Sequence, residues 1–125
     1  MILGIGCDIV RVERVERAAK NERFLIRVYT EAERTYAVQC GRAGAASLAA
    51  RFAGKEAVLK AFGTGLRGGT LHDVEILPGA LGAPEVHLYG YFAARAAEMG
   101  VTRIWITLSH EKEYATAYCI LEGQR

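Results

Sequence analysis

The chain has 125 residues, of which 51% are hydrophobic, and its formal net charge at pH 7 is +2. A chain of this length forms one domain by default, so we expect residues 1–125 to be a single compact domain. The small net charge argues against a general nucleic-acid-binding protein. No uncharged run approaches the roughly 18 residues of a membrane span, and the N-terminus lacks the basic start of a signal peptide. We therefore expect a soluble protein of the cytoplasm that has no membrane partner.

The cysteines Cys7, Cys40 and Cys119 are odd in number and far apart. No CxxC or CxxH spacing occurs, so the pattern indicates neither a zinc site nor a disulfide framework. We expect each of them to be a free thiol.

Residues 1–10 have the sequence MILGIGCDIV, which is typical of a buried strand. Alternation places Gly4, Gly6 and Asp8 on the same face of that strand. Glycines in a strand often mark the close approach of another backbone or of a ligand. Asp8 lies at the end of this face, where it is either a ligand for the site or the N-cap of the next helix.

A short helix is expected over residues 11–20, where Arg11, Arg14 and Arg17 recur at every third position and form a broad basic side. Such a surface is usually an ordinary solvated face. The alternative is a docking surface for an acidic partner, because opposite charges accelerate encounter.

The next segments are expected to be helices over residues 24–28, 30–39 and 43–62. Thr30 and Glu33 fit a capping box at the start of the second of these helices. Gly63 ends the third, in a run with several further glycines.

The long helix carries the most informative stretch, residues 51–60 with the sequence RFAGKEAVLK. Its apolar face is expected to consist of Leu48, Phe52, Leu59 and Phe62. Lys55 lies near the middle of that face, where a lysine is costly unless something pairs with it. Glu56 and Lys60 are four residues apart and therefore neighbours. The plainer interpretation is a solvated Glu–Lys pair beside a lysine that reaches out to water.

The C-terminal half alternates between extended and helical patterns. Strands are expected over residues 74–77 and 85–88, then a helix over 89–99, then two strands over 103–109 and 114–121 that form a hairpin. Because helices and antiparallel strands occur in separate runs, we predict an α+β fold in which antiparallel strands pack with the long central helix.

Several charged residues from different elements could share one chemistry. Asp8 and Glu56 offer two hard oxygen ligands, and Mg²⁺ usually takes one or two protein carboxylates together with water and substrate phosphates. Lys60 could reach the same phosphates, whereas Arg51 would contact a different part of a long ligand. His110 is a candidate general base or phosphate contact, or else a surface histidine at a strand end.

Three segments together resemble a known family. Gly6-Cys7-Asp8-Ile9, the stretch from Arg51 to Lys60, and Leu108-Ser109-His110 look like the three signatures of the phosphopantetheinyl transferases. The length and the N-terminal start resemble the small bacterial type of that family, and the likeness runs along nearly the full chain.

The resemblance implies transfer of the 4′-phosphopantetheine arm of coenzyme A to a serine of an acyl carrier protein, for fatty acid biosynthesis. It implies that Asp8 and Glu56 hold Mg²⁺ and that Lys60 neutralises the departing phosphate. The base for the carrier serine stays open between Glu56, a metal-bound water and His110.

The resemblance also implies a binding site for coenzyme A and an assembly. The residues expected to bind coenzyme A are Arg51, Lys55, Lys60, Gly63, Pro84 and His110. Lys55 could instead be a structural partner. The small type is a homotrimer with active sites between subunits. Since carrier proteins are acidic, the basic helix with Arg11, Arg14 and Arg17 is favoured as their docking surface.

Two other functions compete with this one. A broader transferase would also load the carriers of polyketide or peptide synthases, although the compact length favours the narrower enzyme. A non-catalytic coenzyme A-binding module is disfavoured because Asp8, Glu56 and Lys60 are all present.

Overall fold

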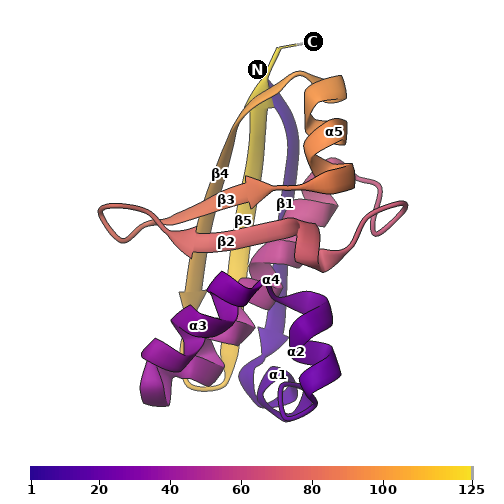
Figure 1. Ribbon diagram of the computed structural model, residues 1–125. Coiled ribbons are helices and arrows are strands. Elements are labelled where there is room, and N and C mark those ends of the chain that lie inside the picture. The colour runs from indigo at the N-terminus through magenta and orange to yellow at the C-terminus, as the bar shows by residue number, and fades with distance from the viewer. Residues whose placement is uncertain (125) are drawn as a thin grey trace.

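The computed structural model describes residues 1–124. Its elements follow in the order β1 (Ile2–Arg11), α1 (Val12–Ala18), α2 (Glu22–Val28), α3 (Glu31–Gln39), the 3₁₀ turn η1 (Gly41–Ala43), α4 (Gly44–Phe62), the 3₁₀ turn η2 (Leu71–Asp73), β2 (Val74–Pro78), β3 (Pro84–Leu88), α5 (Gly90–Met99), β4 (Val101–His110) and β5 (Tyr114–Gly123). Every helix and strand expected from the sequence is present, and the α+β class is confirmed (Figure 1). The two 3₁₀ turns were not predicted.

Two antiparallel sheets organise the chain. The larger sheet has the strand order β1-β5-β4, and the smaller one is the β2–β3 hairpin. The predicted hairpin of β4 and β5 is confirmed, with His110 opposite Ala115 next to the turn. Because β5 is the central strand, β1 and β4 form opposite edges of the larger sheet.

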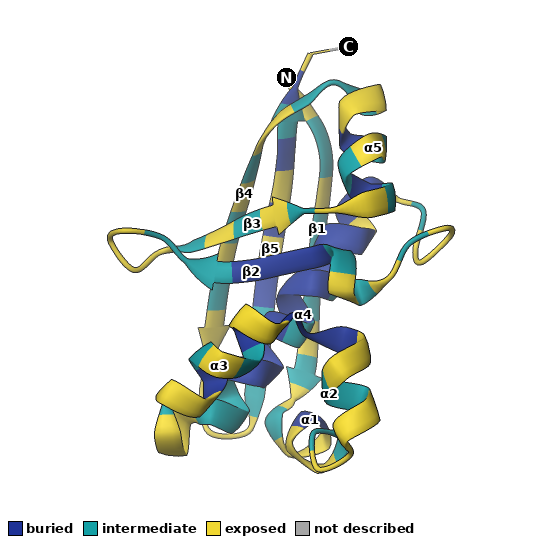
Figure 2. Cartoon of the chain, viewed as in Figure 1, coloured by how far each residue is buried: buried dark blue, intermediate teal, exposed yellow. Residues whose placement is uncertain are grey.

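Helix α4 lies between the larger sheet and the β2–β3 hairpin, and it also contacts α1 and α3 (Figure 1). The expectation of a single apolar face on this helix is wrong, because α4 is buried on most of its circumference (Figure 2). Small residues such as Ala49, Ala53 and Ala57 are fully buried and let neighbouring elements approach on several sides. No helix within residues 1–124 is both long and apolar enough to cross a membrane.

The glycines of β1 lie directly against α4, as the strand pattern predicts. A Cβ atom added to Gly6 would lie 2.1 Å from the carbonyl oxygen of Ala57, and one added to Gly4 would lie 2.1 Å from that of Ala61. Both distances are far below van der Waals contact, so the strand and the helix approach backbone to backbone. Asp8 is on the same face, two residues further along the strand.

Two of the helix ends predicted from the sequence are confirmed, and one possible N-cap is not. Thr30 Oγ1 accepts a hydrogen bond from the Glu33 amide at 3.2 Å, and Glu33 Oε1 accepts one from the Thr30 amide at 2.9 Å, which confirms the capping box. Gly63 ends α4 in the left-handed conformation with φ 77°. Asp8 does not cap α1, because β1 continues to Arg11 and that residue occupies the N-cap position.

We expect Gly6→Ala to lower the free energy of unfolding by about 1–3 kcal/mol, because the new methyl group forces β1 away from the α4 backbone. Chemical denaturation measures this change. Lys112→Ala is the control, since Lys112 is exposed in the turn between β4 and β5, and it should change stability by less than about 0.5 kcal/mol. Equal stability of Gly6→Ala and the unmodified protein would mean that the contact is not tight.

Candidate active site

Asp8, Glu56 and Lys60 come together where the end of β1 passes the second half of α4. Lys60 Nζ donates a hydrogen bond to Asp8 Oδ1 at 3.0 Å. The Asp8 side chain is 17% exposed and that of Lys60 is 56% exposed, so the pair is open to solvent on the lysine side. The structure thus brings together the three residues for which the sequence predicts catalytic roles.

The backbone of Asp8 is held from the far side by β5. Thr116 Oγ1 donates a hydrogen bond to the carbonyl oxygen of Asp8 at 2.8 Å, and Asp8 is paired with Ala117 in the strand ladder. Thr116 was not predicted from the sequence, since it lies 108 residues from Asp8 and reaches it only through the pairing of β1 with β5. Both contacts come from β5, so the backbone that presents the carboxylate is held by the neighbouring strand.

The two carboxylates influence each other. Partial burial, followed by repulsion from Asp8, raises the pKa of Glu56, and the positive charge of Lys60 partly opposes this shift. The hydrogen bond to Asp8, together with the charge of that residue, raises the pKa of Lys60. Crowded negative charge of this kind is relieved by a cation, and Lys60 supplies one here.

An open pocket of about 480 Å³ adjoins these charges. Its lining residues are Glu56, Leu59, Lys60, Gly63, Gly65 and Leu66. Gly63, which the family resemblance implies as a coenzyme A contact, thus borders the same space as Glu56 and Lys60. The glycine-rich segment after α4 forms one wall of the pocket.

The donor set at this position fits Mg²⁺. Asp8 on β1 lies close enough to Glu56 on α4 for its charge to raise the pKa of Glu56, so two carboxylates lie near one another at the edge of the pocket. Mg²⁺ commonly binds one or two protein carboxylates and keeps water and substrate phosphates as its remaining ligands. Asp8 and Glu56 would be the protein ligands, and Lys60 would then be free to turn toward phosphate.

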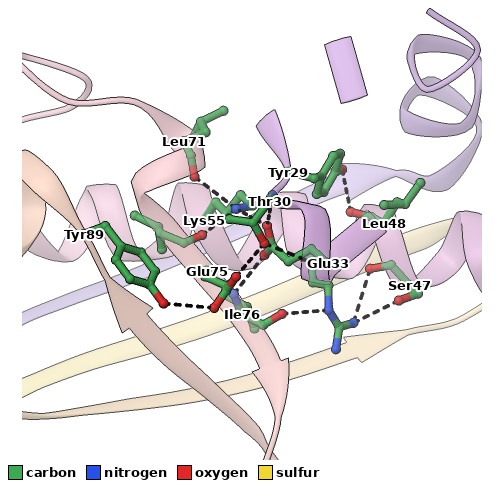
Figure 3. A network of polar contacts seen from close by, with 12 residues as sticks. Tyr29, Thr30, Glu33, Ser47, Leu48, Lys55, Leu71, Glu75, Ile76 and Tyr89 are labelled. Atoms are coloured by element: carbon green, nitrogen blue, oxygen red, sulfur yellow. Dashed lines mark hydrogen bonds and ion pairs between the residues drawn. The ribbon is translucent and has the colours of Figure 1, made fainter. Parts of the chain in front are cut away.

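Lys55 does not line this pocket and is completely buried. Figure 3 shows it within a network of polar contacts that includes Glu33 and Leu71. Its ammonium group donates to Glu33 Oε1 at 2.8 Å, to the carbonyl oxygen of Leu71 at 3.0 Å and to that of Val74. Of the two alternatives that the sequence left open for Lys55, the structure favours the structural one. The capping box predicted where Glu33 lies, but not that it also pairs with a lysine 22 residues away.

Arg51 is also buried, on the side of α4 that faces α3 and β2. Its Nε donates to the carbonyl oxygen of Ile76 at 3.0 Å, and Nη1 donates to Ser47 Oγ at 3.0 Å. The guanidinium carbon lies 4.5 Å from the ring centroid of Tyr36. These contacts hold Arg51 apart from the pocket beside Glu56.

Pro84 and His110 lie near the other edge of the larger sheet. His110 ends β4, and Pro84 begins β3 at the tip of the hairpin, which projects past β4 at the left of Figure 1. Pro84 borders a groove of about 740 Å³ formed by β3, α5 and β4. Within one chain, neither residue adjoins the carboxylates at the β1 edge.

The three arginines of the predicted docking surface differ in their surroundings. Arg11 and Arg14 border a pocket of about 310 Å³, which is lined otherwise by Ile9, Val10, Val15, Ala18, Phe24, Phe52 and Tyr114. The Arg11 guanidinium carbon lies 5.4 Å from the centroid of the Tyr114 ring. Arg17 forms an ion pair with Glu13. A mostly apolar hollow flanked by positive charge was not foreseen from the sequence, because its aromatic residues are far apart along the chain.

Comparison with known proteins identifies the family. Residues 4–119 match the 4′-phosphopantetheinyl transferase superfamily. The chain belongs to this superfamily. A holo-[acyl-carrier-protein] synthase of Desulforudis audaxviator is 47% identical over 98% of this chain and 95% of its own length. One from Halorhodospira halophila is 46% identical over 97% of this chain and 98% of its own.

Solved structures agree with this assignment. The crystal structure of holo-[acyl-carrier-protein] synthase from Neisseria meningitidis matches with a TM-score of 0.89 and 36% identity, covering 98% of this chain and 99% of that one. The Bacillus anthracis enzyme, in complex with coenzyme A (3′,5′-ADP), matches with a TM-score of 0.81 and 32% identity, covering 99% of both chains. The small bacterial type of transferase predicted from the sequence is thereby confirmed.

Proposed function

We propose that this protein transfers the 4′-phosphopantetheine group of coenzyme A to a serine of apo acyl carrier protein, in the cytoplasm and for fatty acid biosynthesis. The whole chain, residues 1–125, would act as one catalytic domain. The observation that carries the proposal is the convergence of Asp8, Glu56 and Lys60 beside an open pocket. It is supported by membership of the superfamily and by similarity to holo-[acyl-carrier-protein] synthases over nearly their whole length.

In the proposed reaction, the serine oxygen attacks the phosphorus atom that bears the pantetheine arm. The bond from that phosphorus to the bridging diphosphate oxygen breaks, and adenosine 3′,5′-bisphosphate leaves. Glu56 would accept the serine proton directly or through a water. Lys60 would stabilise negative charge on the leaving phosphate.

Asp8 and Glu56 would hold the Mg²⁺ ion of this reaction. A bound Mg²⁺ neutralises charge on a diphosphate and polarises its phosphoryl oxygens. The support for this assignment is the pairing of two hard oxygen ligands with only partial burial, which leaves room for water and phosphate.

We further propose that the protein is a homotrimer with its active sites between subunits. The outer face of the larger sheet exposes apolar side chains of Ile5, Ile9, Trp105, Tyr118 and Ile120. Such a contiguous patch on a soluble protein is typical of an interface. Association would also bring Pro84 and His110 of one copy beside Asp8 and Glu56 of another. Arg51 stays a predicted coenzyme A contact.

The carrier protein would dock on α1 and the neighbouring hollow. Arg11 and Arg14 flank that hollow and would attract an acidic helix, while Phe24 and Phe52 on its wall would receive an apolar side chain. Arg17 would contribute at the rim once it leaves Glu13. Charge at a rim mainly sets the rate of encounter, and the apolar contact sets how long the complex lasts.

The first test is intact-mass spectrometry of an apo acyl carrier protein incubated with this protein, coenzyme A and Mg²⁺. We expect a phosphopantetheine mass gain that EDTA suppresses. Asp8→Ala and Glu56→Gln should each reduce transfer by at least about a hundredfold, because each removes a proposed metal ligand. Near-normal turnover of either variant with Mg²⁺ would refute the metal assignment. Coenzyme A binding without any transfer would favour a non-catalytic module.

Carrier docking is tested by charge reversal on α1. Arg14→Glu should raise the KM for the carrier protein by about tenfold through slower association, and it should leave coenzyme A binding unchanged. Arg95→Glu is the matched control, since Arg95 is on α5 and pairs with Glu98. Steady-state kinetics and calorimetry with coenzyme A separate the two effects. Equal loss of both affinities would show that α1 is structural rather than a docking surface.

The assembly is tested by placing a charge on the exposed sheet face. Ile5→Glu should convert the protein to monomers in sedimentation experiments and remove most of the transfer activity, because the site would lose its second half. Val38→Glu serves as the control, since Val38 is 79% exposed on α3. Fluorescence of Trp105, the single tryptophan, reports burial of the face. A fully active monomeric Ile5→Glu variant would refute sites between subunits.

A further inference from the structure

The buried ammonium group of Lys55 is saturated by acceptors from three parts of the chain. Glu33 lies at the start of α3, Leu71 opens η2 and Val74 opens β2 (Figure 3). A lysine has three N–H donors, so each one has a partner. Two of the three acceptors are backbone carbonyls, which means that Lys55 fixes the path of the chain from Leu71 to Val74.

Glu33 completes this arrangement from the other side. Its Oε2 atom accepts a hydrogen bond from the Ile76 amide at 2.8 Å, and both Glu33 and Lys55 are fully buried. Glu75 extends the network outward, since it accepts from Thr30 Oγ1 at 2.6 Å and from the Tyr89 hydroxyl at 3.3 Å. The contacts therefore tie α3, α4 and β2 into one unit.

The segment that Lys55 fixes is the far end of a loop that lines the candidate active site. This loop, residues 63–70, starts at Gly63 on the end of α4 and enters η2 at Leu71. Gly63, Gly65 and Leu66 border the same pocket as Glu56 and Lys60. Gly63, Gly65 and Gly68 have positive φ. Glycine adopts this conformation easily because it lacks a Cβ atom, and for the same reason a glycine-rich loop has many accessible conformations when it is not held. Within the loop, the Gly69 amide donates to the Leu66 carbonyl oxygen at 3.1 Å. The anchors at its two ends add to this local constraint.

We propose that Lys55 is a positioning residue for the coenzyme A pocket. It anchors the second end of the glycine loop to α4, the helix that also carries Glu56 and Lys60. The first end is anchored covalently, because Gly63 directly follows α4. Helix α4 would thus present Glu56 and Lys60 to the pocket. Through Lys55, on another side of the same helix, it would also hold the glycine loop that forms the pocket wall at a fixed distance from these two residues. This inference rests on the proposed function.

The role assigned to Lys55 differs from simple stabilisation. A buried ion pair often contributes little net stability, because desolvation offsets the attraction between its charges. The bonds from Lys55 to the Leu71 and Val74 carbonyls are specific to a donor at this position, and no apolar side chain can replace them. Loss of these two hydrogen bonds should therefore change the conformation of the loop more than it changes the electrostatic energy of the core.

Two variants isolate this effect. Glu33→Gln removes the anionic partner but leaves the Lys55 amine able to donate to both carbonyls. Lys55→Met combined with Glu33→Gln has the same change at position 33 and additionally lacks those two bonds. Comparing one with the other, below the unfolding temperature of both, separates loop anchoring from loss of the ion pair. Tyr89→Phe is a further control, since it breaks only the peripheral bond to Glu75.

We expect amides of residues 63–73 to exchange hydrogen at least about tenfold faster in the double variant than in Glu33→Gln, with no change in β1. The KM for coenzyme A should rise by about tenfold between the same two proteins, while kcat changes by less than about threefold, because the reactive groups are left in place. Tyr89→Phe should match the unmodified protein in all three measurements. Equal loop exchange in the two variants, or faster exchange with an unchanged KM, would overturn the proposal.

A second variant reaches the loop from the solvent side, should the double variant fail to fold. Asp73→Ala removes the hydrogen bond from the Thr70 amide to Asp73 Oδ2, which measures 3.1 Å, without touching the buried pair. It should raise loop exchange and the KM for coenzyme A in the same direction, and faster exchange with an unchanged KM would again refute the idea. Calorimetric binding of coenzyme A gives a reading that is independent of transfer. Absence of transfer by the unmodified protein would reject the proposed function, whereas unchanged affinity in a protein with a loosened loop would reject this inference.

Discussion

The contact between the glycine face of β1 and the backbone of α4 is the constraint on which the candidate site depends. With no side chain at Gly4 and Gly6, the strand lies directly on the carbonyl oxygens of Ala57 and Ala61. Only that short separation lets a carboxylate as short as that of Asp8 reach the ammonium group of Lys60. The geometry of the site therefore depends on the absence of side chains at Gly4 and Gly6 as much as on the carboxylate of Asp8.

Two neighbouring residues of α4 illustrate how one helix serves different purposes. Lys55 turns into the interior and is enclosed by α3, η2 and β2, while Glu56 turns toward the open pocket at the end of β1. Successive residues of a helix differ by about 100° in direction, so adjacent charges necessarily meet different environments. The same helix can in this way carry a polar network in the core and a reactive group at the surface.

Much of the fold follows from local sequence, whereas the pairing of distant groups does not. Thr30, Glu33 and Gly63 act over one turn of chain, and their roles were predictable for that reason. The all-round burial of α4 was missed because alanines give a weak apolar pattern. The ion pair of Lys55 with Glu33 joins different helices, and the separation of Pro84 and His110 from Asp8 depends on which strand is central. Such contacts and separations between distant residues are set by the topology of the fold, which the periodicity of the sequence does not predict.

Both faces of β1 have a role, and this limits which mutations the N-terminal strand can accept. One face holds glycines and an aspartate against α4, and the other exposes Ile5 and Ile9. Insertion or deletion of a single codon before Asp8 would exchange these faces, because side chains alternate along a strand. Branched side chains would then be driven into the helix backbone and the carboxylate turned outward. The N-terminal strand should consequently accept the exchange of one apolar residue for another on its outer face far better than any change in length.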